Sequence, residues 1–209
     1  MKEKDQEKTT RERIFEAAVM LFAQKGYHGT SMRDLARAVG LKESSLYNHF
    51  PGKSSLLEAV LAYQLEGFQA ASALMEEMEE TGPVFNDPVE LWIAGAGAFM
   101  EKLPPLTETI GLILHNEMFL DDQCGRFVLH ELFRVRKELT EKLLRRMHAQ
   151  GLIRYCDFTK TAAQYVHMLH GLEMENRLRR LEGAGVEELQ ARLMEQIVHF
   201  IDGLRNKEN

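Results

Sequence analysis

Hydrogen-bonding side chains are concentrated between Lys42 and His49. Seven of these eight positions are polar, and the polar residues are Lys42, Glu43, Ser44, Ser45, Tyr47, Asn48 and His49. Such donors and acceptors can contact the base edges and phosphates of nucleic acid. Leu41, Leu46 and Phe50 supply an apolar side, so we expect a short helix that packs on one face and presents a polar surface on the other.

A second helix is expected just before this one. Its apolar positions follow helical spacing and are Met32, Leu35, Ala36 and Val39. Ser31 and Asp34 form a capping box at its start. Gly40 ends it, because glycine reaches a left-handed backbone conformation at little steric cost. Two short helices around such a turn form a helix-turn-helix, although an ordinary helical hairpin with a solvated second helix would give the same pattern.

A family resemblance favours the helix-turn-helix. The residues that carry it are Ala36 and Gly40, then Leu46-Tyr47-x-His49-Phe50, then Lys53 and Leu56-Leu57. With them, the stretch from about Thr9 to Val60 resembles the DNA-binding domain of the TetR family of bacterial transcriptional regulators. Lys42 and Ser44 depart from the family pattern, which often has a small polar residue and a glycine there. These departures concern the operator sequence, not the fold.

The resemblance implies a set of DNA-binding residues. Ser31 and Lys53 begin helices, whose N-termini favour phosphates. The candidates for base contacts are Arg33, Lys42, Glu43, Ser44 and Asn48, whereas Tyr47 and His49 match family residues that usually bind the DNA backbone. Ser45 completes the polar face. We expect the partner to be double-stranded DNA with an inverted-repeat operator.

Composition and charge agree with a two-part, all-α protein. The chain has 209 residues, 44% hydrophobic and 28% charged, with five prolines. Net charge is −6, but residues 1–56 carry ten Lys/Arg against seven Asp/Glu, so the basic excess lies with the helix-turn-helix. We expect a DNA-binding domain over residues 1–52, an effector-binding and dimerisation domain over residues 53–209, and about nine helices.

Apolar periodicity and helix-end signals set the expected helix boundaries. The expected helices outside the helix-turn-helix are Thr9–Gln24, Lys53–Glu80, Pro88–Lys102, Leu106–Phe119, a long helix opened by Asp121-Asp122 and running to Gln150, Thr159–Leu181 and Val186–Leu204. The helix from Lys53 would span roughly 40 Å. It is the expected mechanical link between the two domains.

The second domain contains no specific motif, and its roles rest on the resemblance, which implies a small-molecule effector and a homodimer. The expected ligand-binding residues are Phe68, Trp92, Phe99, His115, Phe119, His130, Tyr165 and Leu169. The expected dimer residues form an apolar face on the last helix: Leu189, Leu193, Ile197, Phe200, Ile201 and Leu204. A plain core and packing within the monomer are the alternatives. Two-fold pairing on DNA favours the dimer.

A metal-assisted hydrolase is the rival hypothesis. His167, His170 and Glu173 are spaced along one helix, and two histidines one turn apart can chelate zinc. However, the sequence lacks HExxH, a phosphate-binding glycine loop and a G-x-S-x-G elbow. We therefore expect no enzyme activity, no metal and no cofactor. Cys124 and Cys156 stand alone, as in a reducing cytoplasm, and neither a signal peptide nor a membrane span is expected. Repression released by the effector is favoured over a co-repressor mechanism.

Overall fold

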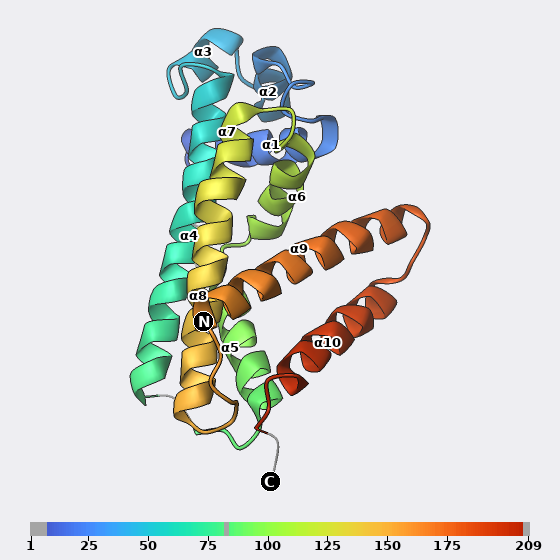
Figure 1. Ribbon diagram of the computed structural model, residues 1–209. Helices are drawn as coiled ribbons and strands as arrows, with labels where there is room; N and C mark the ends of the chain where they lie inside the picture. Colours follow the sequence, from blue (N-terminus) through green and yellow to red (C-terminus); the bar gives the residue numbers. More distant parts are fainter. Residues whose placement is uncertain (1–7, 82–83, 207–209) are drawn as a thin grey trace, which may run out of the picture. The chain divides into compact units, whose positions relative to one another are not determined.

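The chain folds into helices joined by short loops (Figure 1). The computed structural model describes residues 8–81 and 84–206. Its elements are α1 Thr10–Lys25, α2 Met32–Val39, α3 Glu43–Tyr47, α4 Lys53–Thr81, α5 Pro88–Lys102, α6 Thr107–Glu117, α7 Asp122–Phe127, the π-helical segment η1 Val128–Leu132, α8 Phe133–Ala149, α9 Phe158–Leu181 and α10 Val186–Asp202. Since α7, η1 and α8 follow without a break, the described residues form nine continuous helical segments. The all-α prediction is confirmed.

The helices divide into two compact units. The first comprises Met1–Phe68 and Leu103–Leu132, and the second comprises Gln69–Lys102 and Phe133–Asn209. The helix-turn-helix therefore shares its compact unit with α6 and α7, which come much later in the sequence. The functional boundary expected after residue 52 stays a prediction.

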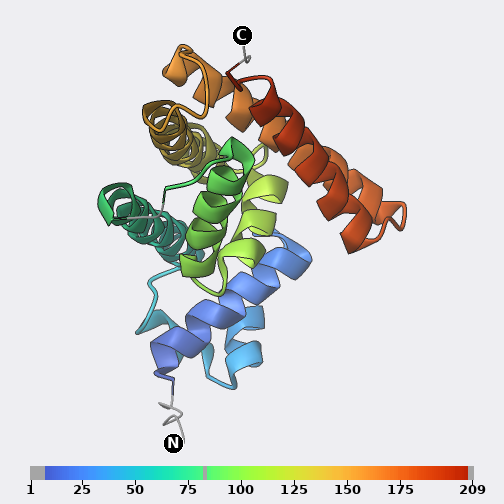
Figure 2. The same cartoon turned by 90° about the horizontal axis from the view of Figure 1, so that it is seen from below.

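The core of the first unit is formed by apolar stripes on α1, α2 and α4, together with α6. α1 packs on both α2 and α6, which Figure 2 shows from below. Among the side chains with almost no exposed surface are Ile14, Phe22, Leu35, Leu46, Leu56, Leu57, Ile110 and Ile113. Burial of this apolar surface stabilises the helix-turn-helix, so its two short helices do not depend on their own propensity alone.

Both predicted capping boxes are present. The Thr9 side chain accepts from the backbone N–H of Glu12, and Ser31 accepts from that of Asp34, with the two carboxylates reaching back to the cap backbone. Gly40 has φ 71° and ψ 29°, the left-handed conformation expected of it. The sequence therefore specifies the ends of α1 and α2 locally.

The long helix expected from Asp121-Asp122 to Gln150 differs from the prediction. Asp121 caps α7 through the backbone N–H groups of Gln123 and Cys124, but η1 interrupts the α-helical pattern. A π turn accommodates an extra residue and rotates the side chains that follow. His130, one of the expected ligand-binding residues, lies in this segment and is exposed, and the buried positions resume at Val135.

The second unit is built around the α8–α9 pair, with α10 packed on α9 and α5. Its interior includes Trp92, Leu144, Met147, Ala162 and Val166. α9 and α10 form a helical hairpin joined at residues 182–185 (Figure 1). None of the helices in the described part of the chain has the length and apolar character needed to cross a lipid bilayer.

Most of the dimer residues expected at the C-terminal helix are buried in the single chain. Leu189, Ile197, Ile201 and Leu204 are at most 8% exposed in the single chain. α10 packs on α9 and α5, so this part of the apolar face is covered within the single chain, and its role in a dimer stays a prediction. Leu193 and Phe200 keep some exposure, and the Phe200 ring packs on that of Tyr165 with 5.3 Å between centroids.

Candidate nucleic-acid interface

α3 presents the polar surface that its sequence predicts. Leu46 is fully buried and fixes the helix to the core, while Lys42, Glu43, Ser44, Tyr47 and Asn48 are exposed. Ser45 and His49 are half-buried. α3 packs on α2, as in a helix-turn-helix. Exposed donors and acceptors on an anchored helix form a surface suited to reading base edges.

Two arginines of α1 hold the ends of the other two helices. Arg11 donates to the backbone carbonyl of His49 at 2.8 Å and stacks over the Phe50 ring at 4.3 Å. Arg13 donates to the carbonyl of Val39 at 3.0 Å. Val39 is the last residue of α2, and the last carbonyls of a helix lack partners within the helix and carry partial negative charge. His49 follows the C-cap of α3. These arginines therefore fix α2 and α3 against α1. Sequence analysis missed them, because nothing in α1 identifies carbonyl partners so far along the chain.

Lys53 is occupied inside the protein. Its ammonium group donates to the carbonyl of Tyr27 at 2.8 Å and lies 4.5 Å from the centre of the Tyr27 ring. A second contact, at 3.5 Å, reaches the carbonyl of His28. The structure thus gives Lys53 a role that the phosphate-binding hypothesis did not include: it fastens the loop between α1 and α2.

Ser31 is also engaged internally. Its hydroxyl donates to a carboxylate oxygen of Asp34 at 2.5 Å and accepts from the Asp34 backbone N–H at 3.1 Å. The hydrogen bonds from Ser31 hold the pKa of the Asp34 carboxyl below its usual value. The serine hydroxyl is therefore used in capping α2, and its phosphate contact remains a prediction.

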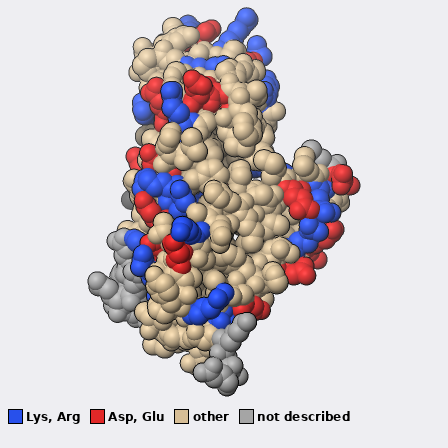
Figure 3. Space-filling view, viewed as in Figure 1, with Lys and Arg blue, Asp and Glu red and all other residues tan. Residues whose placement is uncertain are grey.

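The free cations of this surface are few. Within the described residues, the side chains of Lys25, Arg33 and Lys42 have no hydrogen bond or ion pair, and Arg37 stays 3.9 Å from Asp34. In Figure 3, Lys and Arg side chains are visible at the end of the first unit that carries α2 and α3. Arg33 and Lys42 are thus available to an anionic partner without breaking an existing contact.

The sequence similarity to known proteins lies in this N-terminal part of the chain. Residues 14–60 match the model described as bacterial regulatory proteins, tetR family. The N-terminal part of the chain is therefore similar to the DNA-binding domain of TetR-family regulators. The negative transcriptional regulator IcaR of the biofilm operon icaADBC in Staphylococcus aureus strain Newman is 44% identical over 48 residues. That match covers 23% of this chain and 26% of IcaR, so the chain spans about a quarter of the relative's length.

Solved structures extend the likeness from the N-terminal residues to the whole fold. The regulator PfmR from Thermus thermophilus, a TetR-family protein, covers 96% of this chain and all of its own length, at a TM-score of 0.60 and 24% identity. A transcriptional regulator from Saccharomonospora viridis, solved in complex with choline, covers 94% of this chain and 98% of its own, at a TM-score of 0.62 and 20% identity. At these identities the likeness concerns the fold alone.

The expected ligand-binding residues are distributed over both units. Phe68, His115, Phe119 and His130 belong to the first unit, and Trp92, Phe99, Tyr165 and Leu169 to the second. In the second unit, Trp92 and Tyr165 pack edge to face with 4.6 Å between ring centroids, and both are buried. Burial raises the pKa of the Tyr165 hydroxyl, against a smaller lowering by its hydrogen bond with Trp92.

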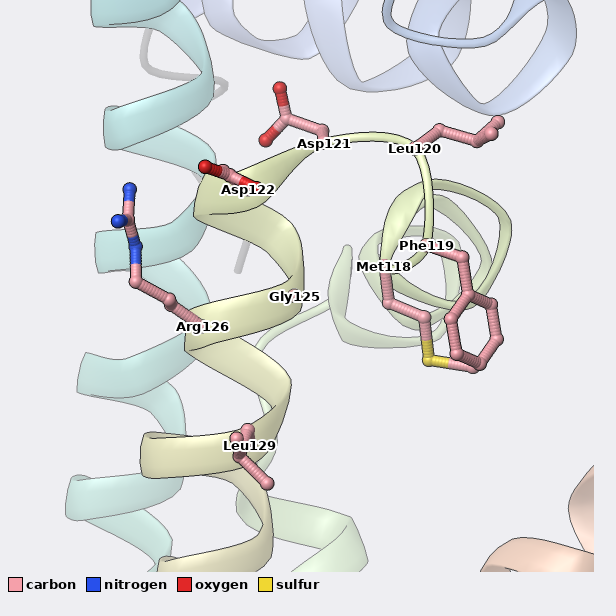
Figure 4. A pocket seen from close by; sticks show the side chains of 8 residues that line it. All are labelled: Met118, Phe119, Leu120, Asp121, Asp122, Gly125, Arg126 and Leu129. Carbon is pink, nitrogen blue, oxygen red and sulfur yellow. The ribbon is translucent and has the colours of Figure 1, made fainter.

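Phe119 and His130 do not occupy enclosed positions. Phe119 is 81% exposed and lines an open cleft of about 280 Å³ around the α6–α7 connection. Figure 4 shows that the cleft's side chains do not converge, since Arg126 points away from the side where Met118 and Phe119 lie. His130 is exposed on η1. Their exposure does not favour an enclosed pocket at these two positions, and their role in ligand binding stays a prediction.

The two histidines of α9 that were considered as metal ligands pack against an aromatic ring. His167 and His170 pack edge-on against the Phe133 ring, at 5.9 and 5.2 Å between centroids. Glu173 accepts from Arg136 at 2.9 Å. Within the described residues, no three His, Cys, Asp or Glu side chains are grouped as metal ligands. The geometry gives no support to the hydrolase hypothesis.

Proposed function

We propose that this chain is a DNA-binding transcriptional regulator, and that it acts as a repressor. The observation that carries the proposal is the exposed polar face of α3, anchored by Leu46 and held at its end by Arg11. The match of residues 14–60 to the TetR family supports it, and the relative IcaR is a negative transcriptional regulator. We propose no enzymatic activity.

The proposed operator is an inverted repeat bound by a homodimer. Two recognition helices reach successive major grooves when they lie about 34 Å apart, which a two-fold dimer provides. The α9–α10 hairpin offers exposed apolar side chains to a second copy, because Leu178, Val186 and Met194 remain 60%, 54% and 37% exposed in the single chain. Figure 3 shows a broad uncharged area on this hairpin, next to the charged side chains near its turn. These exposed residues replace the buried α10 positions as the proposed contact surface.

A small-molecule effector is proposed to release the DNA. The support is indirect: the similarly folded regulator from Saccharomonospora viridis was solved with choline bound. The second unit of this chain contributes aromatic side chains, including the buried Trp92–Tyr165 pair, to an apolar interior. Apolar interiors with a few polar groups are where small ligands usually bind. The interior of the second unit is therefore the proposed place of effector binding.

Selection from a random library of DNA duplexes tests the proposal. The purified protein should enrich a sequence with two-fold symmetry, and its affinity should fall steeply with added salt as counterions are released. A Lys42→Ala/Asn48→Ala variant should keep the helical circular-dichroism signal and enrich nothing, or a different sequence. Enrichment of the same sequence by this variant, or none by the wild type, would contradict the proposal.

A further inference from the structure

A buried carboxylate from outside the helix-turn-helix contacts the loop between α1 and α2. Glu117 is the last residue of α6 and is 4% exposed. Its Oε1 atom accepts a hydrogen bond from the backbone N–H of Tyr27 at 2.8 Å, across 90 residues of sequence. Both residues lie in the first unit, where α1 packs on α6.

The loop leaves space for this carboxylate. Gly26 has φ +79°, a conformation that residues with a side chain rarely adopt, and a Cβ atom there would lie only 2.9 Å from Oε1 of Glu117. On the other side, the Tyr27 carbonyl accepts from Lys53 at 2.8 Å. Both polar backbone groups of Tyr27 are therefore held by charged side chains, one from α4 and one from α6.

Packing alone does not account for a carboxylate at this position. The second oxygen of Glu117, Oε2, is buried and has no hydrogen-bond partner among the described residues. Burying such an atom without a partner is unfavourable, and an apolar side chain would fill the same space without that penalty. The contribution that only an acceptor can make here is the bond to the Tyr27 N–H.

We infer that Glu117 is a positioning residue for DNA recognition, which acts from outside the helix-turn-helix by fixing the Tyr27 peptide. The inference rests on the proposed function. The Tyr27 peptide lies between α1 and α2, and α1 carries the arginines that hold the ends of α2 and α3. Without the Glu117 contact, the orientation of α1 relative to α2 and α3 is therefore less fixed. No side chain proposed to contact DNA changes.

Two conservative substitutions separate this role from simple packing. Glu117→Gln keeps a carbonyl oxygen at the same reach and removes the charge, whereas Glu117→Asp keeps the charge and withdraws the acceptor by roughly 1.5 Å, one carbon–carbon bond. The DNA probe is the duplex enriched by the wild-type protein from a random library. We expect Glu117→Gln to bind it like the wild type and Glu117→Asp to bind it about tenfold more weakly.

Hydrogen exchange gives a readout that does not need DNA. The Tyr27 amide should be protected in the wild type and in Glu117→Gln, and should exchange faster in Glu117→Asp, because exchange follows the opening of that bond. Glu108→Asp, an exposed position on the same helix, is the matched control and should change neither measurement.

The outcomes distinguish the inference from the proposed function. If the wild type enriches no duplex, the proposed function fails, and Tyr27 exchange still decides whether Glu117 holds the loop. If Glu117→Asp, folded by circular dichroism, binds the enriched duplex as tightly as the wild type, the positioning role is wrong. A loss in Glu117→Gln together with wild-type binding by Glu117→Asp would also overturn it, because the charge rather than the reach of the acceptor would then matter.

Discussion

At the scale of single residues, the basic side chains of the helix-turn-helix divide into two groups. Arg11, Arg13 and Lys53 donate to backbone carbonyls at 2.8, 3.0 and 2.8 Å, and so they organise the reading helices. Arg33 and Lys42 are exposed and have no such partner among the described residues. The first group still contributes positive charge to the surface, but its donors are already committed, so substitutions in the two groups should have different effects.

Lys53 tests the first group. Lys53→Met keeps the apolar stem but removes the ammonium that binds the Tyr27 carbonyl. A hydrogen bond from a charged group contributes about 1.5–3 kcal/mol, and partial exposure reduces this, so we expect a loss of about 1 kcal/mol in the free energy of unfolding. Urea denaturation measures it.

Lys25→Met is the control for Lys53, since Lys25 is exposed at the end of α1. It should leave the free energy of unfolding nearly unchanged. If Lys53→Met had full stability and weaker binding to every DNA sequence, Lys53 would be a phosphate ligand after all.

Lys42 and Glu43 test the second group. Both are exposed at the start of α3, where side chains of a recognition helix reach base edges. A good base contact is worth about 1–3 kcal/mol of discrimination. Substituting either by Ala should relax or shift the preference at one or two positions of the selected duplex, symmetrically in both half-sites. An unchanged consensus sequence would show that neither residue contacts the bases.

At this scale, the sequence predicts interactions between residues that are close together in the chain, but not those between distant residues. The caps at Thr9 and Ser31 and the turn at Gly40 depend on residues within a few positions, and all three are as expected. The bonds of Arg11 to His49 and of Tyr27 to Glu117 cross 38 and 90 residues. Neither partner has a local pattern, so only the folded chain reveals them.

At the scale of elements, the sequence likewise does not predict which surfaces cover the apolar face of a helix. The apolar face of α10 was assigned to a dimer, whereas α9 and α5 cover it within the chain. Periodicity identifies an apolar face but not the surface that covers it. Likewise, the continuous pattern after Asp121 predicted one helix, and the π turn at η1 leaves no periodic signature that would separate it from a regular helix.

The capping box of α2 gives a pH dependence. The Ser31 side chain, followed by its backbone N–H, lowers the pKa of the Asp34 carboxyl below its ordinary value of 3.8. In the unfolded chain that carboxyl takes up its proton at higher pH than in the folded chain. The stabilising contribution is therefore complete above the ordinary value and is lost as the pH falls through the lower, folded value.

Asp34→Asn measures this contribution. Its amide oxygen can still accept from the Ser31 backbone, but it does not titrate. The fall in Tm between pH 5 and pH 3 should be smaller in Asp34→Asn than in the wild type. Glu43→Gln, which replaces an exposed carboxylate that makes no cap contact, serves as the control and should leave the fall in Tm unchanged. Identical pH profiles for Asp34→Asn and the wild type would show that the capping carboxylate does not contribute.

At the scale of the whole molecule, the proposed dimer joins two helix-turn-helix domains. Met194→Glu places a charge on the exposed face of α10, and Leu178→Glu does so on α9. Each should shift the protein toward monomers in sedimentation experiments, because burying an unpaired charge in an interface is strongly unfavourable. Val84→Glu, at an 80% exposed position outside the hairpin, should leave the assembly intact. A dimer that survives both hairpin variants would place the interface elsewhere.

The proposed effector and the proposed operator should be coupled, although the sites proposed for them lie in different parts of the chain. A ligand can shift a conformational equilibrium only by its difference in affinity for the two states. If it favours the form that cannot bind DNA, then operator DNA must weaken ligand binding by the same factor that the ligand weakens DNA binding. Coupling free energies of about 1–3 kcal/mol correspond to factors of about 5–150.

The measurement begins with a thermal-shift screen of the purified protein, in which choline and related quaternary ammonium compounds are included. For each compound that raises Tm, calorimetric titration gives its affinity with and without the selected duplex, and fluorescence anisotropy gives the DNA affinity with and without the compound. A scrambled duplex of equal length is the control. An inducer should lose affinity in the presence of the selected duplex alone, and the two ratios should agree. A gain in affinity would identify a co-repressor instead, and equal affinities would show that the compound is not the switch.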